Sequence, residues 1–262
     1  MSTFRQVAIA AALAAGRLLR QQIGQVREIQ YKGAVNLVTE VDLASERLIV
    51  ETIRAAFPDH AFFTEEGTAR DALDAPALWV IDPLDGTTNY AHGYPMFCVS
   101  IAFVRYGRPE VGVVYQPVLD ELFVAERGVG AFLNGERIRV SRHRELRSAL
   151  LATGFPYDLE RRREALAAFA RFTLTSRAIR RDGSAALDLA YVAAGRFDGF
   201  WERELSPWDT AAGVLLVEEA GGTVTDYAGR PFRLDQGACV ASNGLIHEAM
   251  LTTIAGSDEV PR

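Results

Sequence analysis

The sequence predicts a mixed protein, α+β or α/β, in which helices and sheets form layers. Apolar residues recur at helical spacing near the N-terminus and at 42–56, strand-like runs separated by turns follow to about residue 140, and strands then alternate with helices. We therefore expect an N-terminal α+β half at 1–145 with a large antiparallel sheet, and a C-terminal α/β half at 146–262. No Pro/Gly/Ser-rich linker separates the halves, so one continuous structural unit is expected.

Two helices are predicted near the N-terminus. The apolar run at 7–15 is rich in alanine and continues at helical spacing to Ile23, which favours an amphipathic helix over a signal peptide. The second helix is expected at 42–56, with Thr39 and Asp42 in the positions of a capping box. No apolar run reaches the roughly 18 residues of a membrane span, so no membrane association is expected.

The remaining elements are predicted from short apolar runs and their turns. In the first half, strands are expected at 62–64, 78–81, 97–104, 110–115, 121–125 and 131–133. Asn134-Gly135, a strong hairpin signal, pairs the last of these with a strand at 137–140. In the second half, strands are expected near 150 and at 177–181, 197–201, 222–226 and 238–241, and helices at 160–171, 184–194, 207–220 and from 245 onward.

The composition excludes some classes of function. The 34 acidic residues outnumber the 28 basic ones, which argues against a protein that mainly coats nucleic acid. Cys98 and Cys239 lie far apart in apolar runs, which is typical of small buried hydrophobes in a protein of the reducing cytoplasm. Lys32 is the single lysine of the chain, and it is either an ammonium kept for a tight site or a surface residue.

The segment Trp79–Asn89 carries the strongest chemical signal. An apolar strand ends at Asp82, and Asp85 follows in a turn loosened by Gly86, so both carboxylates can face one point. Carboxylates forced together repel unless a cation lies between them, and hard oxygen ligands suit Mg²⁺. Gly86 and Thr87 begin the next predicted helix, where backbone amides can hold an anion. The alternative is an ordinary Asp-Gly turn in which one aspartate caps a helix.

Two further carboxylates have roles that the residues alone leave open. Glu65 ends the strand-like run at 62–64, and it is either a metal ligand or part of a solvated loop. Asp209 lies in the first turn of the helix that Ser206 or Pro207 opens, where an aspartate is usually explained by the helix dipole.

Two segments offer candidate contacts for a substrate. Gly183, Ser184 and Ala185 open a helix with small residues, which either admit a ligand close to the backbone or serve as a plain cap. Glu202 follows an apolar strand, and it either binds substrate hydroxyls or lies on the surface.

Three segments together resemble the inositol monophosphatase family. WVIDPLDGTTNYAHGYP at 79–95 is similar to the first family motif, WDTAAGVLLVEEAGG at 208–222 to the second, and GSAALDLAYVAAGRFDGFWE at 183–202 to a block between them. The resemblance runs from the first helix to about Ile254. It implies a layered αβαβα sandwich of the sugar-phosphatase type and a Mg²⁺-dependent hydrolysis of a small phosphate monoester, with myo-inositol monophosphate as the first choice.

The resemblance also implies roles for single residues. Two Mg²⁺ ions would be held by Glu65, Asp82, the Leu84 carbonyl, Asp85 and Asp209. Glu65 and Thr87 would activate the water that attacks phosphorus. The substrate would contact Glu65, Leu84, Asp85, Gly86, Thr87, Gly183, Ser184, Ala185, Glu202 and Asp209. Lys32 and Asp42 match a motif where a third Mg²⁺ would bind, although Asn36 stands where many relatives carry aspartate.

Other properties follow from the resemblance alone. It implies a homodimer in the cytoplasm, a phosphorylated polyol as substrate, and inhibition by lithium. Fructose 1,6-bisphosphate is an alternative substrate within the same fold. A function of another class is a contact with RNA polymerase in ribosomal RNA transcription, through exposed arginines. The candidates are Arg137, Arg139, Arg142, Arg144, Arg147 and Arg161 to Arg163.

Overall fold

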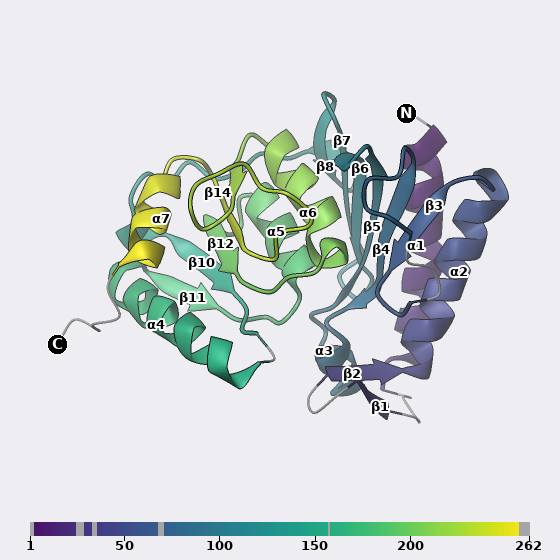
Figure 1. The fold of residues 1–262 in the computed structure, drawn as a ribbon, viewed down its shortest axis with the longest axis horizontal. Coiled ribbons are helices and arrows are strands. Elements are labelled where there is room, and N and C mark those ends of the chain that lie inside the picture. The colour runs from purple at the N-terminus through teal and green to yellow at the C-terminus, as the bar shows by residue number, and fades with distance from the viewer. Residues whose placement is uncertain (1–2, 25–28, 33–35, 68–70, 157, 257–262) are drawn as a thin grey trace.

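The protein is seen here as a computed structural model that describes residues 3–24, 29–32, 36–67, 71–156 and 158–256, with the backbone alone for 29–32 and 36–39. Figure 1 shows five layers in the order helices, sheet, helices, sheet, helices. A seven-stranded and a five-stranded sheet enclose one helical layer, and each sheet carries a further helix pair on its outer face. The αβαβα sandwich implied by the resemblance is confirmed.

The outer helices of the first half are α1 (Thr3–Gln22) and α2 (Glu40–Ala56). Small side chains on α1 let the two helices and the sheet approach closely, and those that are fully buried are Ala8, Ala11, Ala12 and Ala15. Helix α2 begins two residues before the expected start, which leaves Asp42 at its third position, as a capping box requires. Both predicted helices are confirmed.

The seven-stranded sheet has the order β3-β4-β5-β6-β7-β8-β9. Its strands are β3 (Ala61–Thr64), β4 (Leu78–Asp85), β5 (Cys98–Arg105), β6 (Arg108–Gln116), β7 (Glu121–Glu126), β8 (Gly130–Leu133) and β9 (Glu136–Arg137). The pair β3·β4 is parallel and the other pairs are antiparallel. A separate antiparallel hairpin of β1 (Ile29–Lys32) and β2 (Asn36–Thr39) was not predicted from the sequence.

The strand expected at 137–140 is confirmed at Arg137, which pairs with Phe132 of β8, but its extension to Val140 is wrong. Strand β9 ends at Arg137, although the Ile138 amide still donates to Ala131 of β8. The chain then leaves the sheet. The Val140 amide donates instead to the Ala220 carbonyl, at the end of the inner helix α6 (Pro207–Glu219). The Asn-Gly turn was predicted correctly, but the partner of the residues after it lies far away in the sequence.

Strand β4 is buried on both faces. Leu78 and Val80 pack in the core beside the inner helices, whereas Trp79 and Ile81 pack in the core beside α1 and α2. Because side chains alternate along a strand, Asp82 follows Leu78 and Val80 onto the inner face. A β-bulge between Asp82 and Asp85 then bends the chain at the end of the strand.

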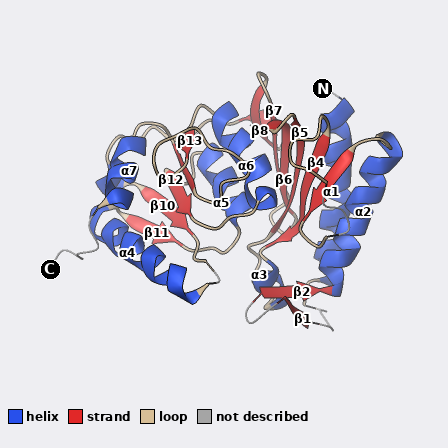
Figure 2. Cartoon of the chain, viewed as in Figure 1, coloured by secondary structure: helices blue, strands red, loops and turns tan. Residues whose placement is uncertain are grey.

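The second half is built on a five-stranded sheet in the order β11-β10-β12-β14-β13. The strands are β10 (Leu150–Thr153), β11 (Ala178–Arg180), β12 (Gly199–Glu202), β13 (Thr223–Thr225) and β14 (Cys239–Ser242). Its outer face carries α4 (Leu159–Thr175) and α7 (His247–Ala255), and its inner face packs on α5 (Ala185–Ala193) and α6 (Figure 2). Short helical segments lie at α3 (Thr87–Ala91) and η1 (Leu146–Ser148).

The sheets lie within 61–137 and 150–242. The boundary between the two halves of the chain at residue 145 stays a prediction. The homodimer also stays a prediction. Within the described residues, no helix is long and apolar enough to cross a membrane.

Candidate active site

A cavity of about 540 Å³ opens where the end of β4, the first turns of α5 and α6 and the loop after β10 meet. The substrate, metal and catalytic candidates inferred from the sequence come from five separate segments. Those that line this cavity are Glu65, Asp82, Leu84, Asp85, Gly86, Thr87, Gly183, Ser184, Ala185, Glu202 and Asp209. The layered fold therefore brings these residues to a single place. Asp42 does not line the cavity, and the side chains of Lys32 and Asn36 lie outside the described part of the chain.

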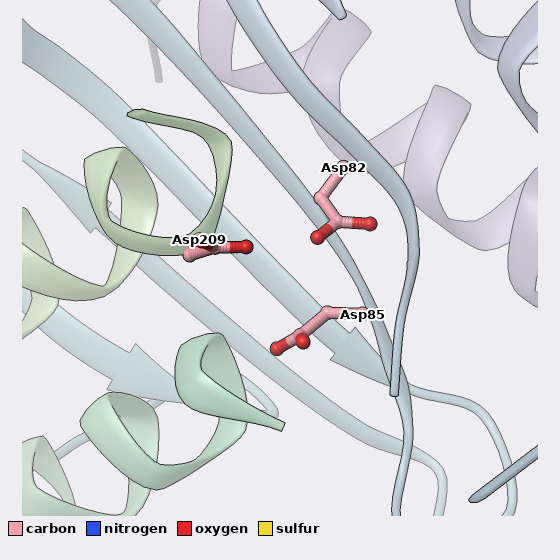
Figure 3. Close-up of side chains that lie close together, drawn as sticks. All are labelled: Asp82, Asp85 and Asp209. Atoms are coloured by element: carbon pink, nitrogen blue, oxygen red, sulfur yellow. The ribbon is translucent and has the colours of Figure 1, made fainter. Parts of the chain in front are cut away.

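Three aspartates form a cluster inside this cavity. Asp82, Asp85 and Asp209 each offer a carboxylate oxygen, and these atoms all lie within 4.8 Å of one another. Figure 3 shows the carboxylates converging from the end of β4 and from the first turn of α6. No arginine or histidine of the described residues forms an ion pair with any of the three.

Asp82 is the most crowded of the three carboxyl groups. Its Oδ1 atom accepts a hydrogen bond from the Leu84 amide at 3.0 Å, and its side chain is also hydrogen bonded to Glu65. Burial raises the pKa of Asp82 well above its usual range, and repulsion from Glu65, Asp85 and Asp209 raises it further. A cation bound beside Asp82 would relieve this repulsion and favour the charged carboxylate.

Asp85 is fixed by donors from the start of α5. Its Oδ2 atom accepts hydrogen bonds from the Ser184 hydroxyl at 2.7 Å, from the Ala186 amide at 2.8 Å and from the Cys98 thiol at 3.8 Å. Burial raises the pKa of Asp85, and these hydrogen bonds oppose the rise. Ser184 forms no side-chain cap on α5, so the reading of this serine as a plain cap is not what the structure shows.

Asp209 has both roles that the sequence left open. It is the third residue of α6, and its Oδ2 atom accepts the Ser206 amide at 2.6 Å as part of a capping box. It also lies in the cluster, where burial and repulsion from Asp85 raise its pKa well above the usual range. Helix capping and membership of the cluster therefore coexist.

At the turn after β4, the Thr87 hydroxyl can donate to a residue of helix α2 and to a residue near the end of β4. It lies within donating distance of Asp42 Oδ1, at 3.0 Å, and of the Leu84 carbonyl oxygen, at 3.1 Å. Gly86 has φ of 96°, and a Cβ atom there would lie 2.9 Å from the Met96 carbonyl oxygen. The turn thus requires glycine at this position, both for its conformation and for space.

The opposite wall of the cavity is formed by Glu202 and the segments around it. Burial raises the pKa of Glu202 to about 8, Arg181 opposes the rise, and Asp85 adds to it. A Cβ atom at Gly154 would overlap the Glu202 carboxylate, so this glycine makes room for it. Asn89 donates to the Asp182 carbonyl at 2.6 Å and so ties this wall to α3.

Sequence reasoning missed several residues of this wall. Arg162, Arg181 and Asp188 all line the cavity. The signal for Asp188 was available, because it is the single charged residue in the apolar run of α5. The two arginines carried no such signal, since arginine is frequent in this chain.

The donor set suits a divalent cation with a preference for oxygen. Each clustered aspartate has one oxygen in a hydrogen bond to a backbone amide, and these bonds hold the carboxylates in place. Repulsion within such a cluster is relieved when a cation binds, and carboxylate, carbonyl and water ligands are those that Mg²⁺ prefers. The residues present therefore fit a Mg²⁺ site.

Comparisons with known proteins agree with this geometry. The model of the inositol monophosphatase family matches residues 1–259. The inositol-1-monophosphatase of Synechocystis sp. is 44% identical, over 99% of this chain and 91% of the relative. The Nus factor SuhB of Pseudomonas aeruginosa is 48% identical, over 97% and 96%.

A solved structure gives the same result. The inositol monophosphatase from Anabaena (Nostoc) sp. superposes with a TM-score of 0.88 at 47% identity, and the match covers 96% of this chain and 95% of that one. The relatives and the solved structure thus match nearly the whole chain rather than one motif. The chain therefore belongs to the inositol monophosphatase family and is a phosphoric monoester hydrolase.

Proposed function

We propose that this protein hydrolyses a polyol monophosphate, myo-inositol monophosphate first, to the free polyol and phosphate with the help of Mg²⁺. The observation that carries the proposal is the cluster of Asp82, Asp85 and Asp209, without a basic partner among the described residues, at the bottom of a cavity. The names of the similar proteins from Synechocystis and Anabaena support the choice of substrate.

Asp82, Asp85 and Asp209, together with Glu65 and the Leu84 carbonyl, would hold two Mg²⁺ ions. When bound, the metal supplies charge stabilisation for the attacking and leaving oxygens and lowers the pKa of water. A third ion near Lys32 and Asp42 stays a prediction of the resemblance.

The side chains near the cluster supply positioning and proton transfer. Glu65, hydrogen bonded to Asp82, would accept the proton of the attacking water, and Thr87 would orient that water. The Asp42 carboxylate can accept the hydrogen bond that the Thr87 hydroxyl donates, which leaves the lone pairs of this hydroxyl available to the water. No side chain is needed as a nucleophile.

Different residues of the cavity would bind the phosphate group and the alcohol part of the substrate. The amides of Gly86 and Thr87 would bind phosphate oxygens, while Gly183, Ala185 and Glu202 would face the alcohol. Ser184 would act through Asp85, since its hydroxyl already donates there. Glu202, with its pKa of about 8, can exchange hydrogen bonds with a hydroxyl as donor or acceptor.

The test is a comparison of kcat/KM across four phosphate esters in Mg²⁺, with a chelator as control. The panel is myo-inositol 1-phosphate, fructose 1,6-bisphosphate, histidinol phosphate and adenosine 3',5'-bisphosphate. We expect the inositol ester to be preferred and activity to vanish with the chelator. A strong preference for the nucleotide, or full activity without metal, would contradict the proposal.

A second candidate function is a contact with the transcription machinery. It is supported by the name of the Pseudomonas aeruginosa relative and by exposed arginines on the segment between the two sheets. Those exposed are Arg137, Arg139, Arg142, Arg144 and Arg147.

This candidate predicts salt-sensitive binding to RNA polymerase. Replacing Arg142, Arg144 and Arg147 by glutamine should weaken co-purification at low salt and leave phosphatase activity unchanged, because none of the three lines the cavity. Equal binding by the wild type and this variant would exclude the arginine segment as the contact.

A further inference from the structure

Helix α5 carries one charged side chain, Asp188, in a helix whose nine residues are all buried. Asp188 itself is 2% exposed. Its amide donates to the Ser184 carbonyl, so it lies one turn after Ser184 on the same face of the helix. A carboxyl group at this depth needs a reason, because burial of a charged or polar group without partners is unfavourable.

One oxygen of the Asp188 carboxyl group lacks a hydrogen-bond partner among the described residues. This atom, Oδ1, is buried, and the side chain forms no ion pair within the described residues. Asp198 is buried to the same extent, at 3% exposed, but accepts hydrogen bonds from Ser141 and from the Leu150 amide and contacts His143. The fold can therefore satisfy a buried aspartate, and it does not do so for the Oδ1 atom of Asp188.

The Asp188 carboxyl group lies at the wall of the catalytic cavity. Asp188 lines this cavity together with Glu202 and Arg181. Burial raises the pKa of Asp188 well above its usual range, and Asp182, Glu202 and Asp85 raise it further, while Arg181 opposes the rise. Two carboxyl groups, those of Asp188 and Glu202, therefore line the same cavity, with Arg181 as a cation beside them.

We propose that Asp188 binds the alcohol part of the substrate, by accepting a hydrogen bond from a hydroxyl group of the polyol. This inference rests on the proposed function and extends it, because it adds a second carboxyl group to Glu202 in the recognition of the alcohol. A polyol supplies hydroxyl donors for these carboxyl oxygens, and the phosphate end of the same molecule is directed to the aspartate cluster. Recognition of this kind is selective, since an ester without hydroxyls leaves the buried acceptor unpaired.

The test uses two substrates that share the phosphate group, so that a loss of alcohol binding can be told apart from a general structural defect. Myo-inositol 1-phosphate presents hydroxyls to the wall, whereas the leaving group of p-nitrophenyl phosphate has none. Asp188→Ala removes both acceptor oxygens, and we expect KM for the inositol ester to rise about tenfold with kcat within about twofold, as for one lost hydrogen bond. Asp188→Asn keeps one acceptor oxygen, so its KM should rise less, by about threefold. Constants for p-nitrophenyl phosphate should not change for either variant.

Thermal unfolding of the metal-free protein provides the second readout. Asp188→Ala removes a buried carboxyl group with an unpaired oxygen and inserts a strong helix former, so we expect Tm to rise by about 2–4 °C. The matched control is Asp198→Asn, which lies outside the cavity and should lower Tm while leaving both KM values unchanged.

The outcomes distinguish the two claims. A raised KM for the inositol ester alone, with Tm unchanged or raised, supports the role of Asp188. An unchanged KM, or a loss of Tm with equal damage toward both esters, overturns it and makes Asp188 a structural residue. A wild-type protein that hydrolyses neither ester in Mg²⁺ contradicts the proposed function itself.

Discussion

Asp226 and the aspartates of the cavity differ in the partners that compensate for their burial. Asp226, 4% exposed after β13, accepts hydrogen bonds from the amides of Ala228 and Arg230 and from the Arg230 Nε atom, at 2.8, 2.9 and 2.6 Å. Burial acts to raise the pKa of Asp226, but the hydrogen bonds from Arg230 and Ala228 outweigh it and the pKa falls. In the cavity, burial and mutual repulsion raise the pKa values of Asp82 and Asp209.

The difference lies in the source of the positive charge. The loop that carries Asp226 also carries its cation, so this aspartate stabilises the fold without a ligand. The clustered aspartates have amide and hydroxyl donors that orient them, but among the described residues no cation pairs with them. Such a region costs stability in the metal-free protein, and this cost is expected where a site is prepared for a ligand.

The largest effect is expected from Asp85→Asn. The substitution preserves volume and removes one charge from the cluster, so kcat in Mg²⁺ should fall by about 10³-fold or more. Because it also relieves repulsion, the metal-free variant should unfold at a temperature no lower than the wild type. A variant with near-normal turnover would contradict the assignment of Asp85 as a metal ligand.

The second effect is a pH dependence that Mg²⁺ should reverse. A carboxyl group whose pKa is raised by folding contributes stability that is present below its unfolded pKa of about 3.9 and is lost as pH rises through the folded pKa. In a chelator, Tm should therefore fall as pH rises above the unfolded pKa, because folding raises the pKa values of Asp82, Asp85 and Asp209. Excess Mg²⁺ should raise Tm more at pH 8 than at pH 5, because binding requires deprotonated ligands. Equal gains at both pH values would argue against this linkage.

Asp226→Asn tests the other half of the comparison. It weakens the hydrogen bonds and the ion pair with Arg230, so urea unfolding should show a loss of about 2 kcal/mol, with unchanged kcat and KM. Since the pKa of Asp226 is lowered, the stability it contributes is present above its unfolded pKa and is lost as pH falls through the folded pKa. The difference between variant and wild type should therefore shrink in acid, and a constant difference down to about pH 2 would contradict this account.

The smallest effect is expected from Gly154→Ala. The added methyl group would overlap the Glu202 carboxylate, which is the end of a side chain that can turn aside. We expect KM for myo-inositol 1-phosphate to rise about threefold to tenfold, with kcat for p-nitrophenyl phosphate unchanged. Unaltered KM would show that Glu202 does not have to occupy its present position.

Much of this fold could be predicted because its signals are local. The alanine-rich stripe of α1, the start of α6 at Ser206-Pro207 and the Asn134-Gly135 turn each depend on residues within a few positions of one another. The extension of the predicted strand at 137–140 to Val140 failed because the Val140 amide is satisfied by Ala220, a partner that no local pattern reveals.

The sequence by itself determined that Asp82 and Asp85 lie together at the end of a strand, and the resemblance added Glu65, Asp209 and Glu202 as their companions. Only the tertiary structure decided that the Ser184 hydroxyl donates to Asp85, that the Thr87 hydroxyl donates to Asp42, and that Asp188 Oδ1 lacks a hydrogen-bond partner among the described residues. The physical reason is that hydrogen bonding and burial depend on layers packed from distant segments. The packing around Asp188 and Asp226, rather than the residue type that they share, determines which one stabilises the fold and which one awaits a ligand.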